Sequence, residues 1–388
     1  MNEAKQMHRE LMNAILPILP RTIYGDIRRV VTLAWAVTGL CRKGTVRLSA
    51  WAEEVTSAAH YAASRVRRFA RWLHNPAIDP AKWYPPLLRA ALSDWTAPSR
   101  AYVALDTTVL APFVLIRASL IYRGRAIPLA WRALRRSSAM VSFETYQIVL
   151  DQIRAVLPAG VIITLVSDRG FLHERLIQYA RQHHWHYRLR LTGDTLVQQH
   201  RQATKAVDQL RPPSGQAHFY QHVRLFGSGL GPLHLALATP SDQPSDPWYI
   251  VSDEPTDLRT LDEFGKRFDI EENFLDDKSG GFQVQITELE TPEAVERLFL
   301  ILAIATLHCT SIGVGVVRAQ MRRWVDTHWD RGLSYLKIGW RWLNQQYRRG
   351  WNAFRSFWLD PAPDPEPVHA SRRRAAAPQR QWGLVLQC

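Results

Sequence analysis

The chain contains very few cysteines. Three of its 388 residues are Cys, and Cys41, Cys309 and Cys388 lie far apart with no paired spacing. This pattern argues against both a disulfide framework and a zinc site, and it favours a reducing compartment. The first ten residues, MNEAKQMHRE, also lack the basic-then-apolar pattern of a secretory signal. We therefore expect a cytoplasmic protein.

One apolar stretch, residues 298–317, is about as long as a membrane-spanning helix. It contains Thr306, His308, Thr310 and two glycines, and charged amphipathic sequence flanks it. We interpret the stretch as a buried core helix and expect no association with a membrane.

Acidic residues are outnumbered by basic ones. Lys+Arg 49 against Asp+Glu 35 leaves a formal net charge of +14, and most of the cations are arginines. A guanidinium pairs with phosphate at two points and stacks on bases, whereas an ammonium group offers only a point charge. The charge therefore favours a polyanionic partner, most commonly nucleic acid, over an uninvolved basic surface. The 15 Trp also suit contacts with bases and sugars, besides packing in a core.

The first 98 residues are predicted to form a helical domain. Apolar periodicity and turn signals place its clearest helices at 24–40, 48–55 and 58–73. On the third of these helices, Arg65, Arg68 and Arg71 recur every three residues and form one basic face. Two short helices with a basic second one resemble a helix-turn-helix, which predicts DNA binding. The alternative is a solvated charged face on a bundle helix.

From residue 101 the periodicity becomes that of an α/β domain. Strands are predicted at 102–110, 115–123, 125–134, 161–170 and 186–191, with helices at 143–157 and 171–184. This order of three antiparallel-looking strands, helix, strand, helix and strand resembles the ribonuclease-H-like fold. In that fold, carboxylates on the first and fourth strands stand side by side.

The remaining segments complete the predicted organisation. We expect a catalytic domain over 99–310 that carries a β-rich insertion at about 192–246, a strand at 248–253 and a helix over 257–278. Helices are predicted from 292 to 358, so a C-terminal helical region covers 311–358. The end of the chain, 359–388, is interpreted as a proline-rich linker over 360–367 and a disordered basic tail.

Two aspartates lie at positions that suit chemistry. Asp106 falls inside a strand whose pattern is otherwise that of a buried element, where a carboxylate is costly unless it is paired or bound to metal. Asp168 ends an apolar strand in the sequence SDRGF, at the carboxyl end where α/β sheets place their sites. Each aspartate alone is a weak signal, because capping and turn formation are common alternatives.

A third carboxylate lies on the helix predicted over 257–278. Phe264, Arg267, Glu271 and Lys278 are three, four and seven residues apart, so all four project from one helix face. Such a face can place a metal-binding carboxylate between two phosphate-binding cations. The alternative is an ordinary salt bridge between Arg267 and Glu271 on a solvated helix.

The spacing Phe264-x2-Arg267-x3-Glu271-x6-Lys278 resembles the Tyr-(2)-Arg-(3)-Glu-(6)-Lys signature of the bacterial DDE transposases of insertion sequence family four. The contexts LDTT and SDRGF are similar to those of that family's first two catalytic carboxylates, and the resemblance covers about residues 100–310. The sequence departs from the pattern in having Phe at 264 instead of Tyr, and in having no Trp within 192–246.

The resemblance implies cut-and-paste DNA transposition catalysed by Asp106, Asp168 and Glu271. Asp106 would bridge two Mg²⁺ or Mn²⁺ ions, and the other two carboxylates would each complete one ion. Arg267 and Lys278 would hold the DNA backbone, with Phe264 beside them. The partners implied are double-stranded DNA, as transposon ends and target, and a second copy of the chain, without a nucleotide cofactor and at the bacterial nucleoid. Two alternatives remain: a nuclease that cuts without joining, and a DNA-binding repressor derived from a transposase.

Overall fold

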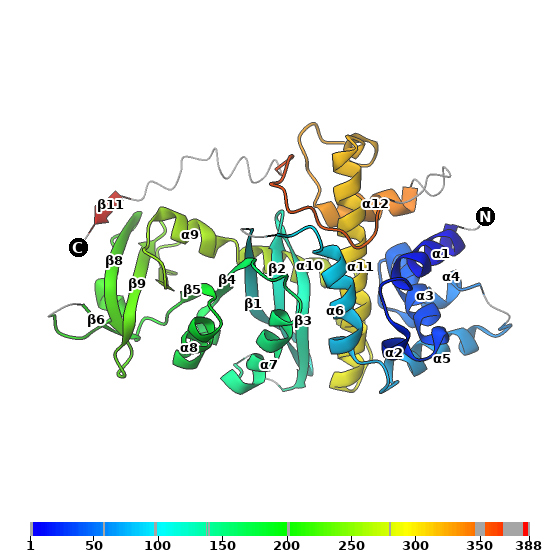
Figure 1. The fold of residues 1–388 in the computed structure, drawn as a ribbon, viewed down its shortest axis with the longest axis horizontal. Coiled ribbons are helices and arrows are strands. Elements are labelled where there is room, and N and C mark those ends of the chain that lie inside the picture. Colours follow the sequence, from blue (N-terminus) through cyan, green and yellow to red (C-terminus); the bar gives the residue numbers. More distant parts are fainter. Residues whose placement is uncertain are drawn as a thin grey trace.

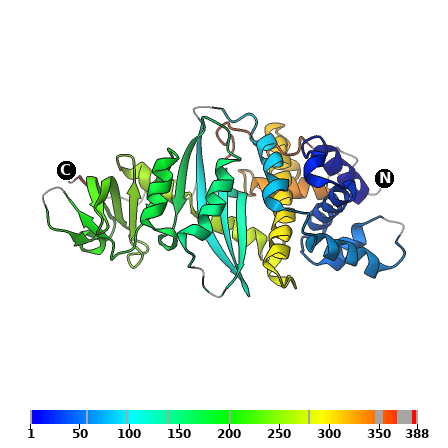
Figure 2. The same ribbon diagram turned by 60° about the horizontal axis from the view of Figure 1, so that its bottom comes forward.

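The structure is a computed structural model that describes residues 3–56, 59–96, 99–136, 138, 140–199, 202–278, 281–345, 354–367 and 383–386. Figures 1 and 2 show one long mixed sheet, with the N-terminal helices at one end and further strands at the other. The predicted basic tail with Arg372, Arg373 and Arg374 lies outside the described residues.

The N-terminal region is helical, as predicted. Its helices are α1 (Glu3–Ile15), α2 (Arg21–Tyr24), α3 (Ile27–Lys43), α4 (Leu48–Glu54), α5 (Ala62–Leu73) and α6 (Pro80–Ala91). The carboxylate of Asp26 caps α3 by accepting from the backbone N–H of Arg28, and Gly44 ends this helix in the left-handed conformation, with φ of 63°.

The sheet contains 11 strands among the described residues, in the order β3-β2-β1-β4-β5-β10-β9-β8-β6-β7, with β11 beside β8. The first five in chain order are β1 (Arg100–Leu110), β2 (Phe113–Tyr122), β3 (Arg125–Arg135), β4 (Ile162–Ser167) and β5 (His186–Arg190). β1, β2 and β3 are antiparallel neighbours, whereas β4 is parallel to β1 and β5 is parallel to β4. The predicted order of strands and helices is therefore confirmed.

Helices cover both faces of this part of the sheet. α7 (Phe143–Arg154) and α8 (Glu174–Gln182) lie in front of the strands in Figure 1, and α10 (Phe268–Asp277) lies behind them. Ile270 and Phe274 of α10 pack on Ala104 and Val166 of the two central strands. The face of the sheet that carries Ala104 is thus the face that α10 covers.

The region between residues 192 and 246 is rich in β-structure, as expected, and it extends the main sheet. Its strands are β6 (Leu196–Gln198), β7 (Lys205–Ala206), β8 (Gln216–Leu225) and β9 (Leu230–Thr239). β9 pairs with β10 (Trp248–Ser252), which in turn pairs with β5. The inserted strands therefore continue the hydrogen-bonded sheet away from its centre.

The single helix predicted over 257–278 is wrong in detail. The structure has two helices, α9 (Leu258–Gly265) and α10, joined at Lys266 and Arg267. The backbone N–H groups of these two residues donate to carbonyls three residues back, so the helix tightens locally and divides. Phe264 and Glu271 consequently belong to different helices.

The apolar stretch at 298–317 forms most of α11 (Pro292–Arg318), which stands between the sheet and the N-terminal helices in Figure 1. This helix is long and apolar enough to cross a membrane, but 94% of its most apolar 18-residue window is buried inside the molecule. The interpretation as a core helix is confirmed.

Helical structure after α11 is less extensive than predicted. α12 (Tyr335–Gln345) crosses α11 closely, because a Cβ built on Gly339 would lie 1.8 Å from the backbone oxygen of Cys309. Residues 319–334 form a loop with one short 3-10 turn, η4 (Arg322–Trp324). The continuous helices predicted from 292 to 358 are therefore wrong for this stretch.

Two predictions for the end of the chain are also wrong. Residues 360–367 are not a free linker: Asp364 accepts hydrogen bonds from Tyr335 and Arg331, and Asp360 pairs with Arg123 at 3.1 Å. The proline-rich segment has no regular secondary structure, and these side-chain contacts hold it in place. Residues 383–386, expected to be disordered, form β11 (Gly383–Leu386) alongside β8.

Candidate active site

Asp106 and Asp168 lie side by side at the centre of the sheet. In the parallel pairing of β1 and β4, Leu105 stands opposite Ser167, so the next residue on each strand is one of the two aspartates. Alternation along each strand puts Asp106 on the same face as Ala104, and Asp168 on the same face as Val166. Both carboxylates therefore point to the face covered by α10.

The carboxyl group of Asp106 is largely buried, with 17% of its side chain exposed. Burial raises the pKa of Asp106 to about 6, against the lowering effects of Arg267 and of the backbone N–H of Thr107. The negative charges of Glu271 and Asp168 raise this pKa further. Asp106 is thus close enough to both Glu271 and Asp168 for their negative charges to act on it.

Arg267 joins two of these carboxylates. Its guanidinium lies 3.2 Å from Asp106 and 2.8 Å from Glu271, and only 5% of its side chain is exposed. Glu271 is much more open, with 47% of its side chain exposed. The salt bridge between Arg267 and Glu271, which the sequence offers as an alternative, is present, and Arg267 also pairs with Asp106 of the sheet. The arginine supplies positive charge between acids that would otherwise repel each other.

Asp168 faces a second buried arginine. Arg190, on β5, lies 3.5 Å from Oδ1 of Asp168 and also bonds the carboxylate of Asp246 and the backbone oxygen of Pro247. The geometry toward Asp168 makes no hydrogen bond, so this buried oxygen has no hydrogen-bond partner among the described residues. An unsatisfied buried carboxylate oxygen is costly, and a bound cation would relieve that cost.

Sequence reasoning missed the buried arginine that anchors α10 to the sheet. Arg117 is fully buried on β2, where it pairs with Asp277 at 2.5 Å and donates to Asn273 at 2.6 Å. Its guanidinium also lies over the ring of Phe274, 4.1 Å from the centroid. The signal was a lone arginine within the apolar strand FVLIRASLIY, since a buried charge requires a partner.

The other predicted DNA-contact residues of this region lie in different surroundings. Phe264 is fully buried, and its ring packs 5.4 Å from that of Trp248. It has no exposed surface to offer to DNA in this structure, because the division of the helix leaves it against β10. Lys278 ends α10 and is partly exposed.

The predicted basic face of α5 only partly faces solvent. Arg68 is half-buried and donates to Thr32 of α3 at 2.9 Å, and Arg65 is also partly covered. Arg71 is exposed, together with Arg67. The helix is therefore turned so that Arg67 is more open to solvent than two of the three predicted residues.

The donor set of the three carboxylates fits a hard divalent cation. Oxygen ligands are those that Mg²⁺ and Mn²⁺ prefer, and a cation would stabilise the ionised form of Asp106 and the unsatisfied oxygen of Asp168. In this structure Arg267 bridges Asp106 and Glu271. These two carboxylates would therefore bind the arginine and the metal ion at the same time.

Another group of potential metal ligands, His186, Asp253 and Glu254, lies near the start of β5, at the opposite end of the parallel strands from Asp168. Arg100 and Arg188 bond the carboxylate of Glu254 and hold its pKa at about 2. Because guanidinium groups already neutralise this cluster, we assign it to an ion-pair network.

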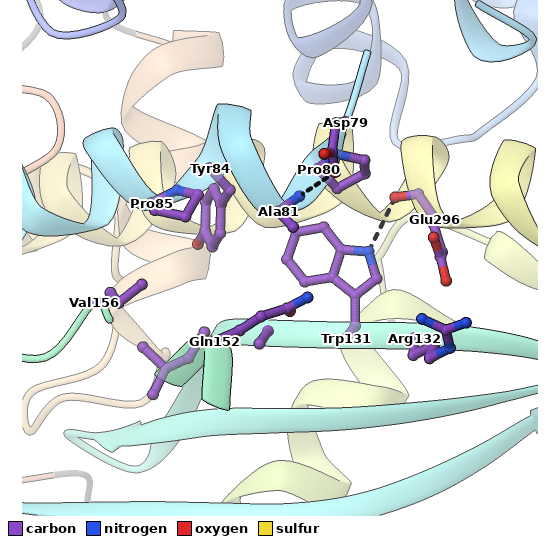
Figure 3. A pocket seen from close by; sticks show the side chains of 12 residues that line it. Asp79, Pro80, Ala81, Tyr84, Pro85, Trp131, Arg132, Gln152, Val156 and Glu296 are labelled. Carbon is purple, nitrogen blue, oxygen red and sulfur yellow. Dashed lines mark hydrogen bonds between the residues drawn. The ribbon is translucent and has the colours of Figure 1, made fainter. Parts of the chain in front are cut away.

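A cavity of about 170 Å³ lies between α6, β3 and α7, and none of the predicted site residues lines it. Figure 3 shows the side chains that line it. Trp131 points across it and donates to the backbone oxygen of Glu296, and Tyr84, Pro80 and Pro85 of α6 line its wall. The cavity is separate from the carboxylates.

Residues 136–307 match the protein family described as "Transposase DDE domain". This match supports a DDE transposase. The matched DDE domain includes Asp168 and Glu271 but begins after Asp106, which the parallel pairing of β1 and β4 brings to the same place.

One solved structure that the chain resembles is titled "Cryo-EM structure of piggyBac transposase synaptic complex with hairpin DNA (SNHP)". The two chains share 12% sequence identity over 90% of this chain and 80% of that one, with a TM-score of 0.44. A comparison with curated proteins finds no significant match.

Proposed function

We propose that the protein is a transposase that cleaves DNA at the ends of a mobile element and joins those ends to target DNA. The observation that carries the proposal is the meeting of Asp106 and Asp168 on adjacent parallel strands, with Arg267 linking Asp106 to Glu271. The family match over residues 136–307 supports the same reading. We further assign the strands around these residues to a ribonuclease-H-like core, and the chain to insertion sequence family four.

Asp106, Asp168 and Glu271 are proposed to hold two Mg²⁺ or Mn²⁺ ions. When bound, such ions act as Lewis acids on the attacking and leaving oxygens of an in-line displacement at phosphorus. The carboxylates keep the ions at one point of the sheet, and the two buried arginines offset the acidic charge that remains. Lys278, at the end of α10, is the proposed contact to the DNA backbone near the scissile phosphate.

The proposed reaction has two steps. In the first, a water oxygen forms a bond to a backbone phosphorus at the element's end, and the bond from that phosphorus to the 3′-oxygen breaks. In the second, the freed 3′-hydroxyl oxygen forms a bond to a phosphorus of the target DNA. The bond from that phosphorus to the target's own 3′-oxygen breaks, and the proton of the attacking hydroxyl is balanced by the one that the new target 3′-hydroxyl takes up. Because two ends must be brought together, we propose that a homodimer acts on double-stranded DNA.

The test uses the full chain and a plasmid that carries the genomic DNA flanking its coding sequence, with Mg²⁺ or with EDTA. We expect breaks at the element's ends and joined products only when metal is present. Asp106→Asn, Asp168→Asn and Glu271→Gln should each abolish cleavage and leave DNA binding intact. Glu272→Gln is the matched control, because Glu272 is the exposed neighbour of Glu271 on the same helix and should cut normally.

Each other outcome points elsewhere. Breaks without joined products would favour a nuclease over a transposase. Binding without cleavage under any metal condition would favour a repressor derived from a transposase. Normal cutting by any variant of the three carboxylates would remove that residue from the active site.

A further inference from the structure

The loop between α11 and α12 displays a tryptophan to solvent. Trp329 is 78% exposed, and Trp324 of the same loop is 46% exposed with its ring 6.1 Å from that of Trp342. The loop lies at the top of Figure 1, where α11 ends. Trp324 therefore has a packing partner, whereas most of the Trp329 surface faces water.

A buried ion pair holds this loop in shape. Asp326 has no exposed side-chain surface and accepts hydrogen bonds from Arg322 at 3.1 Å and from the backbone N–H of Gly332 at 3.0 Å. Arg322 also donates to the backbone oxygens of His328 and Trp329, at 3.0 and 2.7 Å. These hydrogen bonds fix the backbone that carries the exposed ring of Trp329.

This arrangement differs from a loose surface loop. Hiding the indole of Trp329 in the core would favour folding, yet the buried charges hold its backbone where the ring remains in water. A rigid aromatic side chain that is ordered before binding loses little conformational entropy when a partner covers it. The loop therefore has the properties of a preformed contact site.

The charge beside Trp329 indicates what kind of partner it fits. The guanidinium of Arg323 lies 4.6 Å from the centroid of the Trp329 ring. Arg323 is exposed and forms no ion pair with a carboxylate among the described residues. Two more arginines near the loop, Arg318 and Arg341, are exposed as well. An aromatic ring with a neighbouring free guanidinium suits a DNA strand, whose bases stack and whose phosphates accept from arginine.

We propose that Trp329 and Arg323 form a contact site for single-stranded or unstacked DNA, separate from the three carboxylates. Trp329 stacks on an unpaired base, and Arg323 binds a neighbouring phosphate. This inference rests on the proposed function in one respect, namely that DNA is the substrate. A protein partner would instead require an apolar surface for Trp329 and acidic groups for Arg323.

The test measures binding of the full chain to a fluorescein-labelled oligonucleotide of mixed sequence, single-stranded or paired with its complement. Trp329→Ala should weaken binding of the single strand about tenfold, with a smaller effect on the duplex, because stacking needs an open base. Trp329→Phe should restore most of the affinity. Arg323→Ala should lower the dependence of binding on salt by about one phosphate contact, whereas Trp329→Ala should leave that dependence unchanged.

Met140→Ala is the matched control, since Met140 is 75% exposed on another part of the surface and should bind as the unaltered chain does. Unchanged binding of both DNA forms by Trp329→Ala, while the unaltered chain binds DNA, would overturn this inference alone. Weaker self-association with unchanged DNA affinity would also overturn it, in favour of contact with a second copy. Failure of the unaltered chain to bind either DNA would overturn this inference and the proposed function together.

Discussion

Asp106→Asn should make the metal-free protein more stable while it removes activity. The pKa of Asp106 in the folded chain is raised to about 6 from the ordinary 3.8, so the folded state binds this proton more tightly than the unfolded state does. Protonation therefore favours folding, and the stability that it contributes is lost as the pH rises from about 4 to about 6. Above pH 7 the ionised carboxylate costs about 3 kcal/mol of folding free energy.

The amide of asparagine resembles the protonated carboxyl group and carries no charge at any pH. The variant should therefore gain about 3 kcal/mol at pH 8 and about half of that at pH 5, where the folded carboxyl is mostly protonated. Urea unfolding of the metal-free protein at the two pH values measures both differences. Added Mg²⁺ should stabilise the unaltered chain at pH 8 and should stabilise the variant much less.

A variant that is less stable than the unaltered chain at pH 8 would refute this reasoning. It would mean that the attraction of Arg267 for the ionised carboxylate outweighs burial and the repulsion by Glu271 and Asp168. A gain that is the same at pH 5 and pH 8 would also refute it, because the effect would then not come from ionisation.

Two further predictions concern the packing around the site. Asp277→Asn should destabilise the protein by about 3–5 kcal/mol in urea unfolding, because it leaves the fully buried Arg117 without a counter-charge; a loss below about 1 kcal/mol would show that water reaches this arginine. Gly339→Ala should cost at least about 3 kcal/mol, because its methyl group would overlap the backbone oxygen of Cys309, whereas Gly227→Ala, which meets no atom within 4 Å, should change stability by less than about 1 kcal/mol. Equal stability of the two alanine variants would contradict the close crossing of α11 and α12.

Local patterns predicted much of the fold. Alternation of apolar residues located the strands, and their order along the chain was enough to expect the central part of the sheet. Proline content misled the prediction for residues 360–367, because Arg331 and Tyr335, which bind that segment, are distant in the sequence. The division between α9 and α10 also escaped prediction. Gly265 immediately precedes it, but Lys266 and Arg267 keep helical dihedral angles, and an isolated glycine is tolerated within a helical pattern.

The sequence by itself determined which residues are available for chemistry. A carboxylate in a buried strand, another at a strand end and a third at helical spacing from an arginine are all local features. These features make Asp106, Asp168 and Glu271 candidates, and the resemblance of the spacing around Glu271 to the transposase signature is what singles them out. Their chemical types already favour oxygen ligands for a hard metal ion.

Only the tertiary structure decided what each of these groups meets. Arg267 faces inward to Asp106, 161 residues away, and Arg117 meets Asp277 across 160 residues. Trp329 remains in solvent because Arg322 holds the backbone beneath it. Such contacts depend on how separate elements pack, and the energy of a buried charge depends on every group around it. Periodicity within one segment predicts neither how separate elements pack nor the energy of a buried charge.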